Sequence, residues 1–318
     1  MGLAALVRFA TLIALRRTAS DWRVQSATGF GIVLAVALMA SGVIYSNALK
    51  ETALDHTLRN VPDEELNFTV RAFHPLERRA FDATSRFVDD QVQGPLRPYI
   101  TGPTLLIQTS ALYLTGLPQL DLPDSERPRG SLQGITDLED NARLVEGRFP
   151  RPATDEVEVV IDPLGASVLD LELNDRFLVF SAIGGQEEAA TPARVVGIIE
   201  PLDPSNHYWQ IGPWDRSTSA DRQWVALPMY ADMDALFNTA GVALPNLHTD
   251  FVWLFVVDRE GLRASEVESL RATLDGTTTT LSTNLPNSSW DTELGQALQR
   301  YSALLVVAQI PLFLVLSL

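Results

Sequence analysis

LVEGRFPRPATDEVEVVID, Leu144–Asp162, is the most informative stretch of this 318-residue chain. Gly147 suits a helix C-terminus or a tight turn, and Pro150 favours a rigid exit into the following loop. Residues 157–161, VEVVI, are β-branched apart from one glutamate and are bounded by acids, which predicts a strand. The stretch therefore predicts a turn that leads into a strand of a buried sheet.

Strands are predicted on both sides of this stretch, because runs rich in β-branched and aromatic residues are bounded by Pro, Gly, Asp or Asn. These runs are ELNFTVRAF, TLLIQTSALYL, RFLVFSAI, ARVVGII, WVALP and FVWLFVV. Helical spacing is predicted over Leu76–Gln93, where Gly94-Pro95 should end the helix, and over Met229–Thr239 and Gly261–Leu274. Pro201–Arg222, which has turn residues throughout, is predicted to be a loop. Strands outnumber helices without regular alternation, so the expected fold is α+β with a mixed sheet.

An uncharged segment near the N-terminus, Val24–Leu49, predicts a membrane-spanning helix. Its 26 residues would make a helix of about 39 Å, which exceeds a hydrocarbon core of about 30 Å. The alternative is a cleaved signal peptide with Ser46-Asn47-Ala48 at the cleavage site, but such apolar regions usually span only about 7 to 15 residues. The segment is therefore interpreted as a transmembrane helix over residues 24–46.

Charge indicates the orientation of the chain. Four arginines and one acid precede Lys50, whereas 20 basic and 39 acidic residues follow from Lys50 onward. Positive charge stays cytoplasmic, so residues 1–23 are expected inside, with an interfacial helix at Met1–Arg17, and residues 47–300 outside. Tyr301–Leu318 has no charge and is expected to begin a second transmembrane helix, so the natural chain is expected to continue beyond it.

Several kinds of chemistry are excluded by residue type. The chain has no cysteine, so disulfides and thiol catalysis are absent, and its strongly acidic region with a single lysine does not suit nucleic acid. Leu49 precedes that lysine, so no phosphate-binding loop of the Gly-Lys-Ser/Thr type exists. The four histidines are scattered, and no metal-ligand or nucleophile motif occurs. No catalytic, cofactor-binding or metal-binding residue is therefore predicted.

Aromatic residues gather in the long loop predicted at Pro201–Arg222, in NHYWQIGPWD, Asn206–Asp215. Tyr208, Trp209 and Trp214 could form an exposed contact with a partner or ligand. Alternatively, they could anchor the loop to the core. The sequence leaves both interpretations open.

The order of the motifs resembles one known family. LVEGRFP followed by an acid-punctuated strand resembles the extracytoplasmic core domain of MacB-type, FtsX-like ABC transporter permeases. PLGASVLDLELNDRFLVF resembles that family's helix, turn and strand, with Asn174 at a position where glycine is usual; asparagine tolerates the left-handed conformation. ARVVGIIEPLDPSNHYW resembles the strand and proline-rich loop that follow in a large-domain branch of these permeases.

This resemblance implies a domain between the first and second membrane helices of a permease. It implies a separate cytoplasmic ABC ATPase subunit as the site of ATP hydrolysis, contact with membrane lipids, and a second permease copy or half. Such permeases move lipids, lipoproteins or peptides, or control envelope enzymes, and have no catalytic residues of their own. The alternative function is the extracytoplasmic ligand-sensing domain of a two-span receptor or sensor kinase, whose layout is the same.

Overall fold

The computed structural model describes residues 22–121, 123, 128–182, 189–212, 217–218, 225–244 and 246–316. The expected interfacial helix at Met1–Arg17 lies outside this part of the chain. Contacts divide the chain into a compact unit, Thr57–Ser302, and a second unit made of the two terminal segments, Met1–His56 and Ala303–Leu318. The sequence analysis placed the outer domain at residues 47–300.

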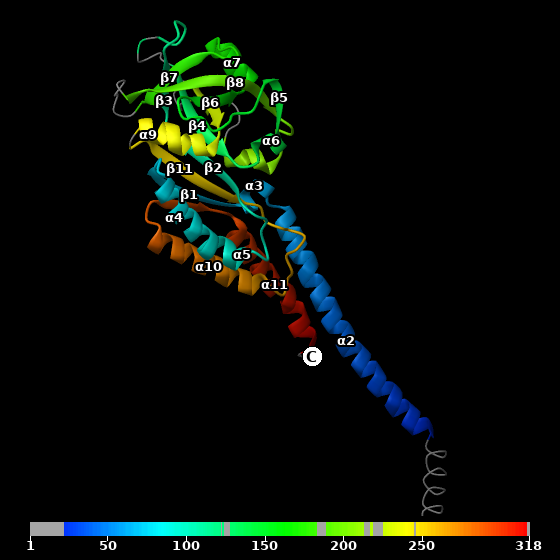
Figure 1. Cartoon of the computed structure of the whole chain (residues 1–318). Coiled ribbons are helices and arrows are strands. Elements are labelled where there is room, and N and C mark those ends of the chain that lie inside the picture. The colour runs from blue at the N-terminus through cyan, green and yellow to red at the C-terminus, as the bar shows by residue number, and fades with distance from the viewer. Residues whose placement is uncertain are drawn as a thin grey trace, which may run out of the picture. The chain divides into compact units, whose positions relative to one another are not determined.

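The structure contains both helices and strands (Figure 1). The helical elements are α2 (Trp22–Arg59), α3 (Asp63–Leu66), α4 (Arg78–Val88), the π-helix η1 (Asp89–Gln93), α5 (Gly94–Leu96), α6 (Leu138–Asn141), α7 (Pro163–Leu169), the 3₁₀ helix η3 (His207–Ile211), α8 (Met233–Ala235), the π-helix η4 (Leu236–Ala240), α9 (Gly241–Ala243), α10 (Val267–Asn284) and α11 (Leu294–Leu316). The strands are β1 (Phe68–Pro75), β2 (Thr104–Thr109), β3 (Leu112–Thr115), β4 (Arg129–Ile135), β5 (Ala142–Gly147), β6 (Val157–Ile161), β7 (Arg176–Ser181), β8 (Thr191–Pro201), β9 (Ser217–Thr218), β10 (Val225–Ala231), β11 (His248–Phe255) and β12 (Ser288–Asp291).

The N-terminal helix α2 is long and apolar enough, over Ser26–Arg59, to cross a membrane by length and composition. Within the described residues it is one uninterrupted helix, and its large apolar side chains are exposed, among them Phe30, Met39 and Ile44. The C-terminal helix α11 continues through Pro311 to Leu316. Pro311 lacks the N–H of one intrahelical hydrogen bond, and the hydrogen bonds on either side of it maintain the helix.

The strands in the described residues belong to one mixed sheet, in which six close into a barrel. The ring runs β4-β3-β7-β8-β6-β10, and β10 returns to pair with β4 in parallel. The pairing of β6 with β8 is also parallel, and the other four pairings in the ring are antiparallel. The closed ring leaves no free edge among these strands.

The sheet continues from the barrel through β4. The first half of β4 pairs with β3, whereas its second half, up to Ile135, pairs with β2. Beyond β2 follow β11, β1 and finally β12 at the end of the sheet, all antiparallel. In Figure 1, α4 and α10 lie together along the β1–β11 part of this sheet. The strand β4 therefore joins two differently built parts of one domain.

Two apolar cores hold these parts together. Beside the barrel, buried side chains of β4, β6, β8 and β10 pack with Tyr208 and Trp209 of η3. Under α4, Phe81 contacts the rings of Phe237, Phe251 and Trp253. Each aromatic pair contributes roughly 0.5–1.5 kcal/mol beyond simple burial, so this cluster fixes α4 and η4 on β11.

The expected strands are present, with corrections to their limits. TLLIQTSALYL forms two strands: β2 pairs with β11 and the second half of β4, whereas β3 pairs with β7 and the first half of β4. Met229–Ala231 belongs to strand β10, so the helix predicted from Met229 begins only at Met233. The helix predicted over Gly261–Leu274 spans Val267–Asn284.

Gly94-Pro95 does not end the helix that begins at Arg78. The helix passes into η1, in which the Gly94 N–H donates to the Asp89 carbonyl five residues earlier, and continues to Leu96. The wider turn places Pro95 in the first turn of α5, where its missing N–H costs nothing. The prediction that this dipeptide stops the helix was wrong.

Candidate functional site

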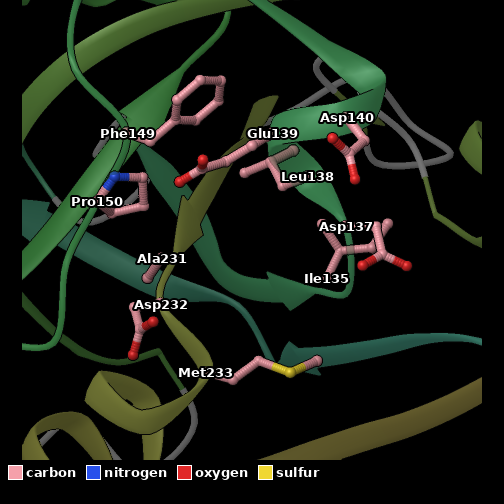
Figure 2. A pocket seen from close by; sticks show the side chains of 10 residues that line it. All are labelled: Ile135, Asp137, Leu138, Glu139, Asp140, Phe149, Pro150, Ala231, Asp232 and Met233. Carbon is pink, nitrogen blue, oxygen red and sulfur yellow. The ribbon is translucent and has the colours of Figure 1, made fainter.

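A pocket of about 410 Å³ opens at the carboxyl ends of the parallel strands β4 and β10 (Figure 2). Ile135 is the last residue of β4, and Ala231 is the last residue of β10. Parallel neighbours end at the same side of a sheet, so the loops that follow them face each other. Phe149 and Pro150 of the β5–β6 connection complete the wall.

The pocket has an acidic rim and an apolar floor. Asp137, Glu139, Asp140 and Asp232 supply carboxylates, and Figure 2 shows Glu139 reaching toward Phe149 and Pro150 while Asp137 and Asp140 lie on another side. The Asp232 carboxylate accepts hydrogen bonds from the N–H groups of Asp234 and Ala235, so it caps α8. The lining is completed by apolar groups, including Leu138 and Met233.

This arrangement determines what the pocket can hold. Within the described residues no three acidic or histidine side chains are grouped closely enough for a metal ion. Carboxylates spread around an apolar floor suit an organic cation with an apolar stem, such as a lysine or arginine side chain. The geometry thus favours a contact with a basic group and offers no assembled catalytic constellation.

Tyr208, one of the predicted contact residues, lies behind this pocket. Its hydroxyl donates to the Thr136 carbonyl at 2.7 Å, and its side chain is buried at 4% exposure. Burial, and next the nearby charges of Asp137 and Asp140, raise the pKa of the phenol far above its usual range. Asp137 has a left-handed backbone (φ 58°), and the hydrogen bond from Tyr208 to the neighbouring Thr136 carbonyl stabilises this turn.

Trp209 is buried as well, at 6% exposure, and its ring meets those of Tyr208 and Tyr230 edge-on. In this structure both aromatic residues anchor their loop to the core, as the second interpretation of the sequence had it. They are not exposed for a direct partner or ligand contact, because η3 turns them inward. Trp214 lies outside the described residues.

The stretch around Gly147 joins the barrel to the β5–β6 connection. Gly147 ends β5 with φ 78° and pairs with Gly197 of β8, next to a bulge between Leu144 and Glu146. It therefore lies at the end of a strand, and not at a helix C-terminus. Asn174 also takes the left-handed conformation, with φ 73°, as the sequence predicted for it.

Arg148, the residue after Gly147, forms a two-pronged ion pair with Glu158 of β6 at 2.5 and 2.6 Å. Arg194 of β8 contacts the same carboxylate and also Glu156, which in turn pairs with Arg176 of β7. Hydrogen bonds from Arg148 lower the pKa of the Glu158 carboxyl more than burial raises it. Glu156, just before VEVVI, and Glu158, within it, are therefore ion-pair partners of arginines. These ion pairs link β6 to β7, to β8 and to the residue that follows β5.

The segments that enter and leave the compact unit meet at one junction. The Glu293 N–H donates to the Glu65 carbonyl at 2.7 Å, and the Thr292 hydroxyl donates to the Leu66 carbonyl at 3.1 Å. Arg259 secures the incoming segment by donating to the Val61 carbonyl at 2.7 Å. The end of α2 and the start of α11 are thus held to the same domain by short, direct bonds.

The acidic rim was not recognised from the sequence, in which scattered carboxylates were interpreted as solvated charge. The run Thr136–Asp140, TDLED, directly after a short strand was the available signal. Asp232 lies far from this run in the sequence, and only the pairing of β4 with β10 brings them to one pocket.

No protein-family model matches this chain, and no curated protein is significantly similar to it.

Proposed function

We propose that this chain is the N-terminal part of an ABC transporter permease, whose outer domain transmits the movement of two membrane helices. In this proposal α2 is the first span, α11 begins the second, and Thr57–Ser302 lies outside the cell membrane. A separate cytoplasmic ATPase supplies the energy. The work done is export or extraction of a lipid, lipoprotein or peptide, or control of an envelope partner.

The junction of the two chain segments supports this proposal. The compact unit begins within α2, at Thr57, and ends within α11, at Ser302. The hydrogen bond from the Glu293 N–H to the Glu65 carbonyl joins the residue before α11 to α3, the short helix that follows α2. Hydrogen bonds between the entering and leaving segments suit a mechanical transmitter, whereas a tethered binding domain would tolerate a flexible linker at either end.

The proposal is supported further by charge and by α2. The exposed apolar surface of α2 is costly in water and favourable in lipid. Arginines before it and acidic residues after it favour a cytoplasmic N-terminus. The order of motifs from Leu144 to Trp209 resembles that of MacB-type permeases, as described above.

The first test is a pair of single-cysteine variants, because the natural chain has no cysteine. Gln91→Cys, in exposed η1, is expected to react with a membrane-impermeant maleimide in intact spheroplasts. Ser20→Cys is expected to react only after lysis. Reaction of Ser20→Cys alone in intact spheroplasts would overturn the orientation.

The second test locks the junction and measures the associated ATPase. Thr69 and Asp291 are paired across β1 and β12, so Thr69→Cys with Asp291→Cys should allow an oxidised cross-link. We expect the ATP hydrolysis rate of the copurified complex to change on oxidation and to recover with dithiothreitol. Arg143→Cys with Glu200→Cys, paired across β5 and β8, is the matched control. Absence of any ABC ATPase from the purified complex would count against the proposal.

The second candidate function is a two-span sensor, which is favoured by the acidic pocket at β4 and β10. A sensor would bind a basic ligand there and transmit the signal through α11. The two functions are distinguished by the coding sequence after Leu318: a permease continues into further apolar spans, and a sensor continues into a charged helical region with a heptad repeat.

A further inference from the structure

A second pocket, of about 320 Å³, lies between α10, β12 and the first turns of α11. All residues around it belong to the compact unit Thr57–Ser302. This volume lies at the lower end of the range of about 300–1,000 Å³ typical of small-molecule sites. It is separate from the acidic pocket and shares no residue with it.

The walls of this pocket are two polar stripes that face each other. Arg271, Asp275 and Thr278 follow one another at helical spacing on α10. Gln296 and Gln299 of α11 lie opposite, also one turn apart. With Thr292, the lining thus presents one positive group, one negative group, two hydroxyls and two neutral amides.

The two glutamines have unused hydrogen-bonding capacity. Both side chains are exposed, and neither amide has a hydrogen-bond partner within the part of the chain that the structure describes. An amide offers two donors and an acceptor, so it can serve a ligand hydroxyl in either direction. The two neutral amides favour neither a positive nor a negative ligand. They match a ligand with many neutral polar groups.

Trp290 gives the pocket an aromatic wall. One face of its indole stacks on the buried Phe68, at 5.3 Å between ring centroids and 12° between planes, while the half-buried side chain also lines the pocket. The stack fixes the orientation of the ring at the wall of the pocket. A rigid aromatic face beside amides and a hydroxyl suits the apolar face and hydroxyl edge of a sugar ring.

We infer that this pocket binds a neutral saccharide, one or two sugar units at the end or within a glycan chain. The sugar face packs on Trp290, and its hydroxyl groups bond to Gln296, Gln299, Thr278 and the Arg271–Asp275 stripe. The strong excess of acids in the domain disfavours anionic glycans and leaves neutral ones as the matching class. This inference does not depend on the permease proposal, because a sensor could bind the same ligand.

The pocket can be filled without disturbing its walls. Gly295 lines it, and a Cβ atom added there would meet no other atom within 4 Å. Gly295→Leu therefore places a side chain in the space of the ligand, and leucine favours the helix over glycine. Gly276 of α10 also has open space but does not line the pocket, so Gly276→Leu is the matched control.

The experiment measures binding of cellotetraose, maltotetraose and chitotetraose to the full chain by saturation-transfer NMR and calorimetry. Lipid nanodiscs without glycolipids replace sugar-based detergents, which would compete for the pocket. We expect at least one tetrasaccharide to bind, and Gly295→Leu to weaken this binding at least tenfold. Gly276→Leu should leave it unchanged.

Removal of both amides tests the hydrogen bonds separately. Gln296→Ala with Gln299→Ala should weaken binding by about 4- to 100-fold, since each hydrogen bond contributes roughly two- to tenfold. Gln91→Ala, an exposed glutamine of η1 outside the pocket, should have no effect. Failure of all three tetrasaccharides to bind the native chain, or unchanged binding by Gly295→Leu, would overturn the inference.

Discussion

Gly147 of β5 and Gly197 of β8 lie opposite each other. Neither position has room for a side chain, because backbone atoms of the opposite segment lie too close. A Cβ atom on Gly147 would overlap the Val196 carbonyl oxygen and lie 2.8 Å from the Gly197 Cα. A Cβ atom on Gly197 would lie 2.5 Å from the Arg148 carbonyl oxygen. The close approach of the two strands thus depends on both glycines, and it places Arg148 beside Glu158.

Gly147→Ala should strongly destabilise the domain. The left-handed backbone costs a non-glycine residue about 1–2 kcal/mol, and overpacking adds about 1–3 kcal/mol. For a domain of this size the expected fall in Tm is about 5 to 15 °C, measured by thermal unfolding. Gly102→Ala is the control, because that glycine is exposed with no atom within 4 Å of an added Cβ. Equal Tm values for the two variants would contradict the packing argument.

Glu158→Gln should destabilise the domain by about 1–3 kcal/mol at pH 7, because Arg148 and Arg194 lose a shared charged partner. The pKa of Glu158 is lowered in the folded protein, so the stabilisation by its carboxylate is complete above the ordinary value of 4.5. It is lost as the pH falls through the folded-state pKa.

The difference in unfolding free energy between native protein and Glu158→Gln should therefore shrink below that pH. Denaturant unfolding at pH 7, 5 and 3 measures it. Glu146→Gln, at an exposed position of β5, should change little at any pH. A difference that stays constant down to pH 3 would show that the ionised pair does not stabilise the fold.

Tyr208→Phe removes the hydrogen bond to the Thr136 carbonyl and should cost about 0.5–1.5 kcal/mol. The raised pKa of Tyr208 means that the unfolded chain loses this proton first. The native protein should then lose stability as the pH rises above the ordinary tyrosine value of 10.0, and Tyr208→Phe should lose less. Denaturant unfolding between pH 8 and 11 measures both effects. Tyr99→Phe, at a half-buried tyrosine outside the pocket, controls for general alkaline effects.

Arg78→Ala should cost about 0.5–2 kcal/mol, although Arg78 lies on an exposed helix. Its guanidinium pairs with Asp234 and stacks over the Phe237 ring at 4.3 Å, so it fastens α4 to η4. The next residue offers a matched comparison, since Arg79→Ala removes the same charge without these contacts. We expect Arg79→Ala to change the free energy of unfolding by less than about 0.5 kcal/mol. Similar losses for both variants would indicate a general effect of charge.

The sequence predicted strands where apolar and β-branched residues form unbroken runs, as in β6 and β8. It missed β4, because Ser131 and Gln133 interrupt the apolar pattern. Both residues are buried, and the Gln133 amide donates to the Ser131 hydroxyl at 3.1 Å. Buried polar side chains inside a strand lower its hydropathy, so the apolar pattern does not reveal the strand.

Barrel closure could not be predicted for a related reason. It depends on the parallel pairing of β4 with β10, which are remote in sequence, and no local pattern encodes such a pairing. The acidic pocket arises from the same pairing of β4 with β10, so it could not be predicted from the sequence either. By contrast, Asn174 was predicted correctly, because a left-handed turn depends on the residue itself.

The junction at Glu65 and Glu293 also sets how the domain responds to force. It continues into β1 and β12, which are antiparallel and begin their pairing at Thr69 and Asp291, beside the junction. β12 has four residues and lies at the end of the sheet, so opposite pulls on the two ends would break its hydrogen bonds one after another. When both ends move in the same direction, no tension acts on the hydrogen bonds between β1 and β12. The pairing of β12 with β1 is therefore expected to separate first when the two ends of the domain are drawn apart.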